Sequence, residues 1–450
     1  MDTGDTAWIM MSTALVLLMT PGLAFFYGGL VRGKNAAATI MQAFVMLGVA
    51  GVAWVLWGYS LAFGPDLGGF IGNLEWFGLR NVGMAPGPYS DTIPHLTFMA
   101  FQMMFAVITP ALILGAFAER AKFSTYLVFT VVWMTVVYAP LAHWVWGGGW
   151  IGTELAALDF AGGTVVHINA GAAALAGAFF YGKRRGVARE TVPHNVTMVV
   201  LGTALLWFGW FGFNAGSALA ANGGAANAFV TTNTAAAMGA LTWMALSWRY
   251  TGKASIVGTA TGAVAGLVAI TPAAGFVGEW PATDGYLNAF PALIIGAAAG
   301  LAGFYAVRLR HRYDLDDTLD VVAVHGICGI VGAMLTGVFA VSTIAGVEGL
   351  IEGSFDLLWR QLFAVLASIA WALTLTSAIL WVLNKKMGLR VDENAELAGL
   401  DRSEHEEPAY QFDEPGLGSY SGGVSTVVSG PAPEVGQAPS IHADDEGISS

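Results

Sequence analysis

Long apolar stretches recur along most of the chain, and they restrict its possible folds more than any other feature of the sequence. A helix of about 20 predominantly apolar residues crosses the ~30 Å hydrocarbon layer of a bilayer. Hydrophobic residues make up 56% of the chain and charged residues only 11%. Because a soluble protein of this length needs a much larger charged surface, a soluble helical core is excluded. We predict an all-α, multi-pass protein of the cell (plasma) membrane.

Polar residues between the apolar stretches predict eleven transmembrane helices. They lie near residues 7–31, 38–63, 93–118, 123–146, 160–181, 195–215, 227–249, 254–272, 287–309, 320–341 and 357–384. We expect the first span to be retained, since its acidic start lacks the basic region of a cleaved signal peptide.

The positive charges predict the orientation of the chain. Of the 19 Lys and Arg residues, all but Arg80 and Arg360 lie around loops that follow odd-numbered spans or in the C-terminal tail. Such residues are enriched on the cytoplasmic side of a membrane. The N-terminus is therefore predicted outside and the C-terminus in the cytoplasm.

The sequence divides into three predicted regions. Residues 1–384 form the transmembrane domain, 385–410 a cytoplasmic segment, and 411–450 a tail rich in Gly, Ser, Pro and acidic residues. The tail has too little apolar content to bury a core, so we expect disorder. Much of the acid behind the net charge of −12 lies near the C-terminus, so a nucleic-acid partner has no support. The single Cys328 excludes an intrachain disulfide and a cysteine metal cluster.

Two histidines occupy matching positions in the fifth and tenth predicted spans. They are His167 and His325, and each follows an acidic residue near the span end, Asp159 and Asp320 respectively. Eleven spans divide into five, five and one, and an odd-numbered repeat re-enters the membrane from the opposite side. This pattern predicts an inverted 5+5 repeat plus one additional helix, with the functional site between the halves.

Ionisable residues deep in a membrane are costly, and they mark functional sites by default. A lone buried histidine is better explained as a structural hydrogen-bonding group, but the matched pair of His167 and His325 favours a function. Haem ligation by two facing imidazoles is an alternative. The other histidines, such as His143, lie at span ends or in loops, so at most one pair is available. We predict no cofactor.

The chemistry of the span interiors restricts what could cross. No ring of acidic residues falls in the middle of the spans, and a bare ion in so dry a lining meets an idealised cost of order 20 kcal/mol. A neutral polar molecule loses only a few kcal/mol on leaving water. Removing a proton from ammonium, whose pKa is roughly 9, costs about 3 kcal/mol at pH 7. A path on which the permeant loses its charge at the entrance is therefore favoured.

Aromatic residues near the outer span ends suit the entry of a cation. A tryptophan face contributes up to ~2 kcal/mol to a desolvated cation, and a serine hydroxyl can accept a hydrogen bond from it. Taken singly, each aromatic is better explained by the interfacial aromatic belt. The candidates are Phe101 and Phe105 in span three, Trp146 in span four, Trp210 and Phe213 in span six, and Ser217 after it.

Four runs of sequence resemble motifs of the ammonium transporter (Amt/Mep/Rh) family, prokaryotic Amt type. They are Ala139–Gly149, Asp159–Asn169, Gly209–Ser217 and Asp320–Gly329. The resemblance covers about residues 5 to 410 and leaves out the tail.

This resemblance implies a non-enzymatic homotrimer that takes up ammonium or ammonia through one pore per subunit. The roles it implies follow the motif positions. Trp146, Phe101 and Ser217 would recruit the cation, with Asp159 supporting the site; Phe105 and Phe213 would stack as a gate; His167 and His325 would line a hydrophobic pore and share a hydrogen bond.

The resemblance also implies a partner on the cytoplasmic face. Gly388–Val391 and Gly399–Asp401 resemble the regulatory C-terminal region that PII-type (GlnK-like) signalling proteins engage, so residues 385–410 are assigned that role. Two related functions stay open at this point: a neutral-solute channel of the rhesus type, and an ammonium sensor.

Overall fold

Every predicted span lies on a helix in the computed structural model, which describes residues 1–186, 192–278, 280–282, 285–313 and 315–411. In chain order the helical segments at the eleven spans are α1 (Thr3–Leu30); η1 (Gly33–Asn35), α2 (Ala36–Phe44), α3 (Met46–Ala53), η2 (Trp54–Gly58) and α4 (Tyr59–Phe63); α5 (His95–Leu114); α6 (Phe123–Trp133), η4 (Met134–Tyr138), α7 (Ala139–Trp146) and α8 (Trp150–Thr153); η5 (Gly163–Ile168) and α9 (Asn169–Tyr181); α10 (Val196–Trp210), η6 (Phe211–Ala215) and η7 (Gly216–Ala218); α11 (Gly223–Thr251); α12 (Ile256–Ile270); α13 (Phe290–Tyr313); η8 (Val322–Ile327) and α14 (Cys328–Phe339); and α16 (Asp356–Lys386).

The remaining elements are short and connect the long helices. They are the hairpins β1 (Asp66–Leu67) with β2 (Ile71–Gly72), β3 (Pro86–Gly87) with β4 (Ser90–Pro94), and β5 (Trp280–Ala282) with β6 (Gly285–Leu287), all antiparallel, and the helices η3 (Phe77–Leu79), α15 (Ser342–Ala345), η9 (Leu350–Glu352), α17 (Glu393–Ala398) and α18 (Leu400–His405).

The lengths of the helices confirm an all-helical membrane fold. Within the described ranges, nine helical segments are long and apolar enough to cross a membrane. The shorter α12 is also apolar, and α11 is 29 residues long but carries asparagine and several threonines. The count of eleven crossings therefore stays a prediction.

Side-chain caps fix where several of these helices begin. Asp2, Asn195, Asn222 and Ser255 each accept a hydrogen bond from a backbone N–H three residues later, at the start of α1, α10, α11 and α12. Such caps satisfy backbone donors that the first helical turn leaves unpaired. Asp2 and Asn222 lie between or before the predicted spans, whereas Asn195 and Ser255 lie at the first residues of theirs.

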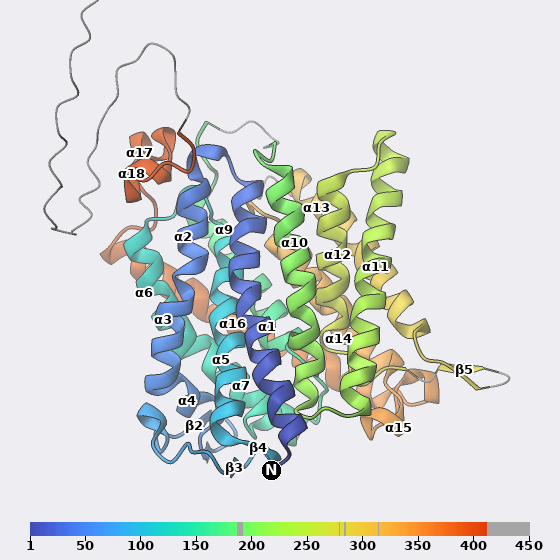
Figure 1. Ribbon diagram of the computed structural model, residues 1–450. Coiled ribbons are helices and arrows are strands. Elements are labelled where there is room, and N and C mark those ends of the chain that lie inside the picture. Colours follow the sequence, from blue (N-terminus) through green and yellow to red (C-terminus); the bar gives the residue numbers. More distant parts are fainter. Residues whose placement is uncertain (187–191, 279, 283–284, 314, 412–450) are drawn as a thin grey trace, which may run out of the picture. The chain divides into compact units, whose positions relative to one another are not determined.

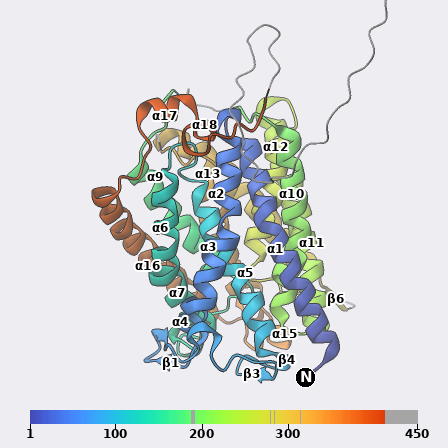
Figure 2. The same cartoon turned by 60° about the vertical axis from the view of Figure 1, so that its left-hand side comes forward.

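The two ends of the helical bundle carry different structures, as Figures 1 and 2 show. The N-terminus lies beside β3 and β4 at one end, where the Asp2 N–H donates to the Thr92 carbonyl at 2.7 Å. Helices α17 and α18 lie at the opposite end. There the Asp401 carboxylate accepts from the Ala38 N–H, and the Glu404 carboxylate accepts from the Phe123 N–H, both at 2.8 Å. The segment from residue 385 to 410 is thus packed on the ends of α2 and α6.

The predictions for the tail fall almost entirely outside the described residues. Residues Met1–Tyr410 form one compact unit. The expectation of disorder for residues 411–450 therefore stays a prediction.

Candidate functional site

Both predicted histidines lie on a π-helical turn that begins a longer helix. His167 lies in η5, which continues into α9, and His325 lies in η8, which continues into α14. A π-helical turn is uncommon and is frequent at functional sites, although η2, η4 and η6 are also π-helical in this chain. The two histidines therefore share a π-helical backbone conformation as well as a sequence pattern.

The two helices that carry His167 and His325 run in opposite directions. Arg184, just after α9, binds Asp316, just before η8, with hydrogen bonds of 2.7 to 3.1 Å. At the other end, Gln361 bonds to Leu158, before η5, and to the Ala333 carbonyl in α14. The beginning of each helix is thus tied to the far end of the other.

Glycines let these antiparallel helices cross closely next to the histidines. A Cβ added to Gly171 would lie 2.3 Å from the Gly326 Cα, and one added to Gly329 would lie 3.2 Å from the His167 Cβ. Each glycine is four residues after the histidine of its own helix and packs beside the histidine of the other. Small residues at such crossings allow close backbone approach within a membrane.

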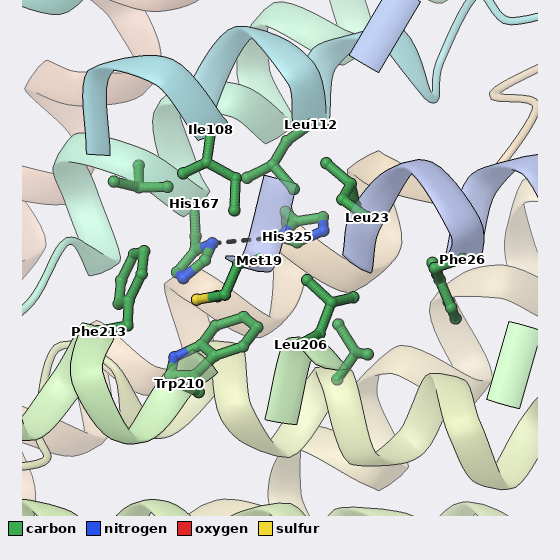
Figure 3. Close-up of a pocket in the computed structure, with 12 residues that line it drawn as sticks. Met19, Leu23, Phe26, Ile108, Leu112, His167, Leu206, Trp210, Phe213 and His325 are labelled. Carbon is green, nitrogen blue, oxygen red and sulfur yellow. Dashed lines mark hydrogen bonds between the residues drawn. The ribbon is translucent and has the colours of Figure 1, made fainter. Parts of the chain in front are cut away.

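The close crossing brings the two imidazole rings together. The Nδ1 atoms of His167 and His325 are 3.2 Å apart, and the ring planes differ by 24° (Figure 3). Only 1% and 4% of the two residues is exposed. In such a bond one Nδ1 carries the proton and donates while the other accepts, so the two rings take opposite roles.

A narrow apolar cavity lies against this pair. Its free volume of about 10 Å³ is close to what a single water-sized molecule occupies. Aliphatic and aromatic side chains surround it, and the two imidazoles are the polar rings beside it. The lining residues are Met19, Leu23, Phe26, Ile108, Leu112, Val166, His167, Leu206, Trp210, Phe213, Val264 and His325 (Figure 3).

Phenyl rings close the cavity next to His167. The Phe213 ring lies 5.9 Å from the His167 ring at 24°, and the Phe105 ring lies 4.4 Å from that of Phe213. Phe105 in turn contacts Phe101 at 5.0 Å and Trp146 at 5.9 Å, both edge to face. The two predicted gate rings meet at 45°, so their contact is tilted rather than a parallel stack. The aromatics thus form a continuous series from Trp146 and Phe101 to the histidines.

The two polar candidates beside the aromatic series are both partly exposed. The Ser217 hydroxyl donates to the Phe213 carbonyl at 2.8 Å, which leaves its oxygen lone pairs as acceptors. The Trp146 indole N–H donates to the Asp159 carbonyl at 2.9 Å, which fixes the orientation of the ring. Trp146 is thus linked to the aromatic series by its ring contact with Phe105, and Ser217 by its bond to the Phe213 carbonyl.

Asp159 is a helix cap. Its carboxylate accepts hydrogen bonds of 2.7 Å from the N–H groups of Gly162, Gly163 and Thr164, and it also binds the Thr164 hydroxyl. A carboxylate at a helix N-terminus both pairs free donors and interacts favourably with the helix dipole. Asp159 therefore holds the start of the helix that carries His167.

The second half of the chain has its cap at Asp317 instead of Asp320. The Asp317 carboxylate accepts from the Val322 N–H at 2.7 Å, and Asp317 precedes His325 by eight residues, as Asp159 precedes His167. Asp320 forms an ion pair with Arg310 at 3.0 Å. Burial, together with the charge of Asp320, raises the pKa of the Asp317 carboxyl to about 6. The acid equivalent to Asp159 is therefore three residues earlier than the sequence pattern suggested.

The cavity also has a wall that the sequence did not indicate. Met19, Leu23 and Phe26 of α1 line it. They follow the spacing of one helix face, but in a helix that is apolar on all sides this spacing carries no signal. The role of α1 could be found only from the structure.

The geometry does not favour iron between the histidines. Two imidazoles that ligate one haem iron bind on opposite faces of the haem, so with bonds of about 2 Å their ligating nitrogens would be about 4 Å apart. The Nδ1 atoms are 3.2 Å apart and share a hydrogen bond. Across the described residues, no group of three or more His, Cys, Asp or Glu side chains could hold a metal ion.

Comparison with known proteins identifies the family. The sequence pattern of the Ammonium Transporter Family matches residues 7–410. This chain belongs to that family. It is similar to an ammonium transporter of Bacillus subtilis, with 48% identity over 91% of this chain and 99% of that protein. It is also similar to the ammonium transporter Amt1 of Archaeoglobus fulgidus, with 46% identity over 91% of this chain and all of that protein.

Solved structures of family members have the same fold. The crystal structure of Saccharomyces cerevisiae Mep2 matches with a TM-score of 0.80 and 39% identity, over 88% of each chain. A structure described as a sensor Amt protein matches with a TM-score of 0.80 and 28% identity, over 89% of this chain and 98% of that one. This Amt-family chain is thus a multi-pass membrane protein, and its fold is shared by Mep2 and by a protein described as a sensor.

Proposed function

We propose that this family member is a transporter, and not an enzyme, that takes up ammonium and passes ammonia through a pore lined by His167 and His325. The observation that carries the proposal is the hydrogen-bonded imidazole pair beside an apolar cavity with room for one small molecule. Such a cavity disfavours a bare cation and admits a neutral polar molecule that can bond to a ring nitrogen.

The outer part of the path recruits the cation before it loses its proton. Trp146 and Phe101 offer aromatic faces, and Ser217 offers an acceptor oxygen. A cation over such faces gains about 0.5 to 2 kcal/mol, more as it is desolvated. The ammonium ion gives its proton to water at the entrance, because the cavity behind Phe105 and Phe213 is dry and disfavours a charge. Asp159 supports this site by holding the helix start and, through its carbonyl, Trp146.

The proposal extends to topology and assembly. Eleven crossings, with the N-terminus outside and the C-terminus in the cytoplasm, arrange the spans as an inverted 5+5 repeat plus α16. The antiparallel course of the two histidine helices and their matching caps support this repeat. We propose a homotrimer with a pore in each subunit, built from residues 1–384, with 411–450 as a disordered tail.

Regulation is assigned to residues 385–410, where a PII-type signalling protein would bind beside the basic loops. Support comes from the contacts that this segment makes with the loops at its end of the bundle. Arg185 forms an ion pair with Glu393 at 2.7 Å, and the Lys34 ammonium donates to the Glu396 carbonyl at 3.1 Å. A partner that displaced α17 would therefore disturb both loops.

Ammonium-evoked current tests the proposed path, with proteoliposomes on a solid-supported membrane. The wild-type protein is expected to give a larger response to ammonium than to potassium at equal concentration. Phe213→Leu should change the ammonium rate on the order of tenfold. Phe117→Leu is the matched control, since Phe117 is equally buried but does not line the cavity. Equal effects of the two variants, or no ammonium response in the wild type, would refute the transport path.

A further inference from the structure

Trp210 forms a wall of the cavity beside His167, and its orientation depends on one hydrogen bond. The indole N–H donates to the Thr271 hydroxyl oxygen at 2.9 Å. Trp210 is 2% exposed and Thr271 is fully buried. A buried indole N–H needs a partner, so this bond determines which way the ring faces.

The orientation of the His167 ring depends on Trp210. Among the described residues, the Nε2 atom of His167 has no hydrogen-bonding partner, so the bond to His325 is the polar contact that holds the ring. Its plane is otherwise set by packing. The Trp210 ring lies 5.5 Å away at 23°, nearly parallel to the imidazole (Figure 3).

Thr271 is itself held rigidly at the end of α12. Its hydroxyl donates to the Leu267 carbonyl at 2.7 Å, which directs an oxygen lone pair to the indole. The next residue, Pro272, lies against the start of η5, where a Cβ added to Gly163 would be 2.5 Å from the proline ring. The end of α12 thus contacts both Trp210 and the helix that carries His167.

We propose that Thr271 is a positioning residue for permeation. It acts through the Trp210 indole to fix the plane of the His167 ring, and so the direction in which the free Nε2 atom meets the permeant. The inference rests on the proposed function of the histidine pair. It adds a residue that lies outside the cavity lining and outside the four family-like sequence runs.

The test compares substitutions that differ by one group. Thr271→Val keeps the shape and removes the acceptor, whereas Thr271→Ser keeps the acceptor. The control is Thr376→Val, because the Trp133 indole donates to the Thr376 hydroxyl at the same 2.9 Å, also in the buried interior but away from the cavity. The readout is the ratio of ammonium to potassium current, which a merely structural loss does not change.

We expect Thr271→Val to lower this ratio on the order of tenfold, as for the loss of one buried hydrogen bond. Thr271→Ser and Thr376→Val should both keep the wild-type ratio of ammonium to potassium current. A Thr271→Val ratio equal to that of Thr376→Val would overturn the inference. If the proposed function itself were wrong, His167→Ala would also leave the ratio of ammonium to potassium current unchanged. This result distinguishes the two failures.

A second comparison removes the donor. In a Trp210→Phe background no indole N–H is left, so Thr271→Val should have no further effect on the current ratio. Trp210→Phe can be compared with the double variant Trp210→Phe/Thr271→Val even if Thr271→Val alone does not accumulate, because the double variant buries no unpaired indole donor. A further loss in the double variant would show that Thr271 acts by another route, and the inference would be wrong.

Discussion

Replacing Asp159 with alanine should damage the protein more than its position at a span end suggests. The carboxylate accepts backbone bonds of 2.7 Å from Gly162, Gly163 and Thr164. Alanine removes the carboxylate that accepts from all three N–H groups and leaves these donors at the start of η5 unpaired. The helix that carries His167 therefore loses its cap.

The size of the effect follows from the number of donors. A buried donor without a partner costs about 1–3 kcal/mol, so three such donors cost about 3–9 kcal/mol. Water can replace part of the loss near the end of a span, so we expect about 3–5 kcal/mol. Folded domains are stable by only about 5–15 kcal/mol, so this loss is a large share of the total.

Yield and thermal unfolding in detergent measure this loss, and ammonium current per folded protein measures its effect on the site. Asp159→Glu keeps a carboxylate one methylene away and should be milder. Asp317→Ala is the matched control, because the Asp317 cap carries a backbone bond of 2.7 Å to Val322 in the equivalent position. We expect it to cost less than Asp159→Ala.

Two results would refute this reasoning. If Asp159→Ala unfolded at the wild-type temperature, the three backbone bonds would not be limiting for stability. If Asp159→Ala and Asp159→Glu both transported ammonium at near-normal rates, Asp159 would be a helix cap without influence on the site.

Three further predictions concern the pore, the tail and pH. Replacing both His167 and His325 with apolar residues should leave a folded protein whose ammonium current, or discrimination against potassium, falls on the order of tenfold; wild-type rate and selectivity would make the pair structural. Truncation after residue 411 should leave transport, trimer assembly and PII pull-down intact, whereas truncation near 386 should impair activity or PII binding; loss of binding at the first cut would assign the contact to the tail. The pKa of Asp317 is raised to about 6, above about 3.9 in the unfolded chain, so its contribution to stability is present below pH 4 and lost as the pH rises through 6. The unfolding temperature should therefore fall over that range, and Asp317→Asn should reduce the dependence.

The helices and the histidine pair were predictable because each has a strong local signal. Apolar length alone places a helix at every predicted span, and the caps at Asn195 and Ser255 lie at the starts of two of these spans. His167 and His325 stand out because an ionisable residue is rare in such a context. Their meeting at 3.2 Å agrees with the shared hydrogen bond that the resemblance implied.

The parts that were not predictable depend on packing between distant segments. The bond from Trp210 to Thr271 joins residues 61 positions apart, and neither residue is unusual in its own helix. The choice of Asp317 over Asp320 as the second cap depends on which carboxylate the backbone folds back to reach, and both are near the span. Neither the Trp210–Thr271 bond nor the choice of Asp317 as the cap can be predicted from a pattern of residue types.

Packing between distant segments also explains why glycines lie beside the two histidines. A hydrogen bond between two imidazoles requires their helices to cross within reach of both short side chains. Gly171 and Gly329 permit that crossing, because any larger residue would meet the opposing backbone or the His167 side chain. In a membrane interior an imidazole without a partner is costly, so each ring stabilises the other. Bulk added at Gly171 would separate the pair and leave two unpaired rings, which makes the glycine crossing as necessary to the proposed pore as the histidines themselves.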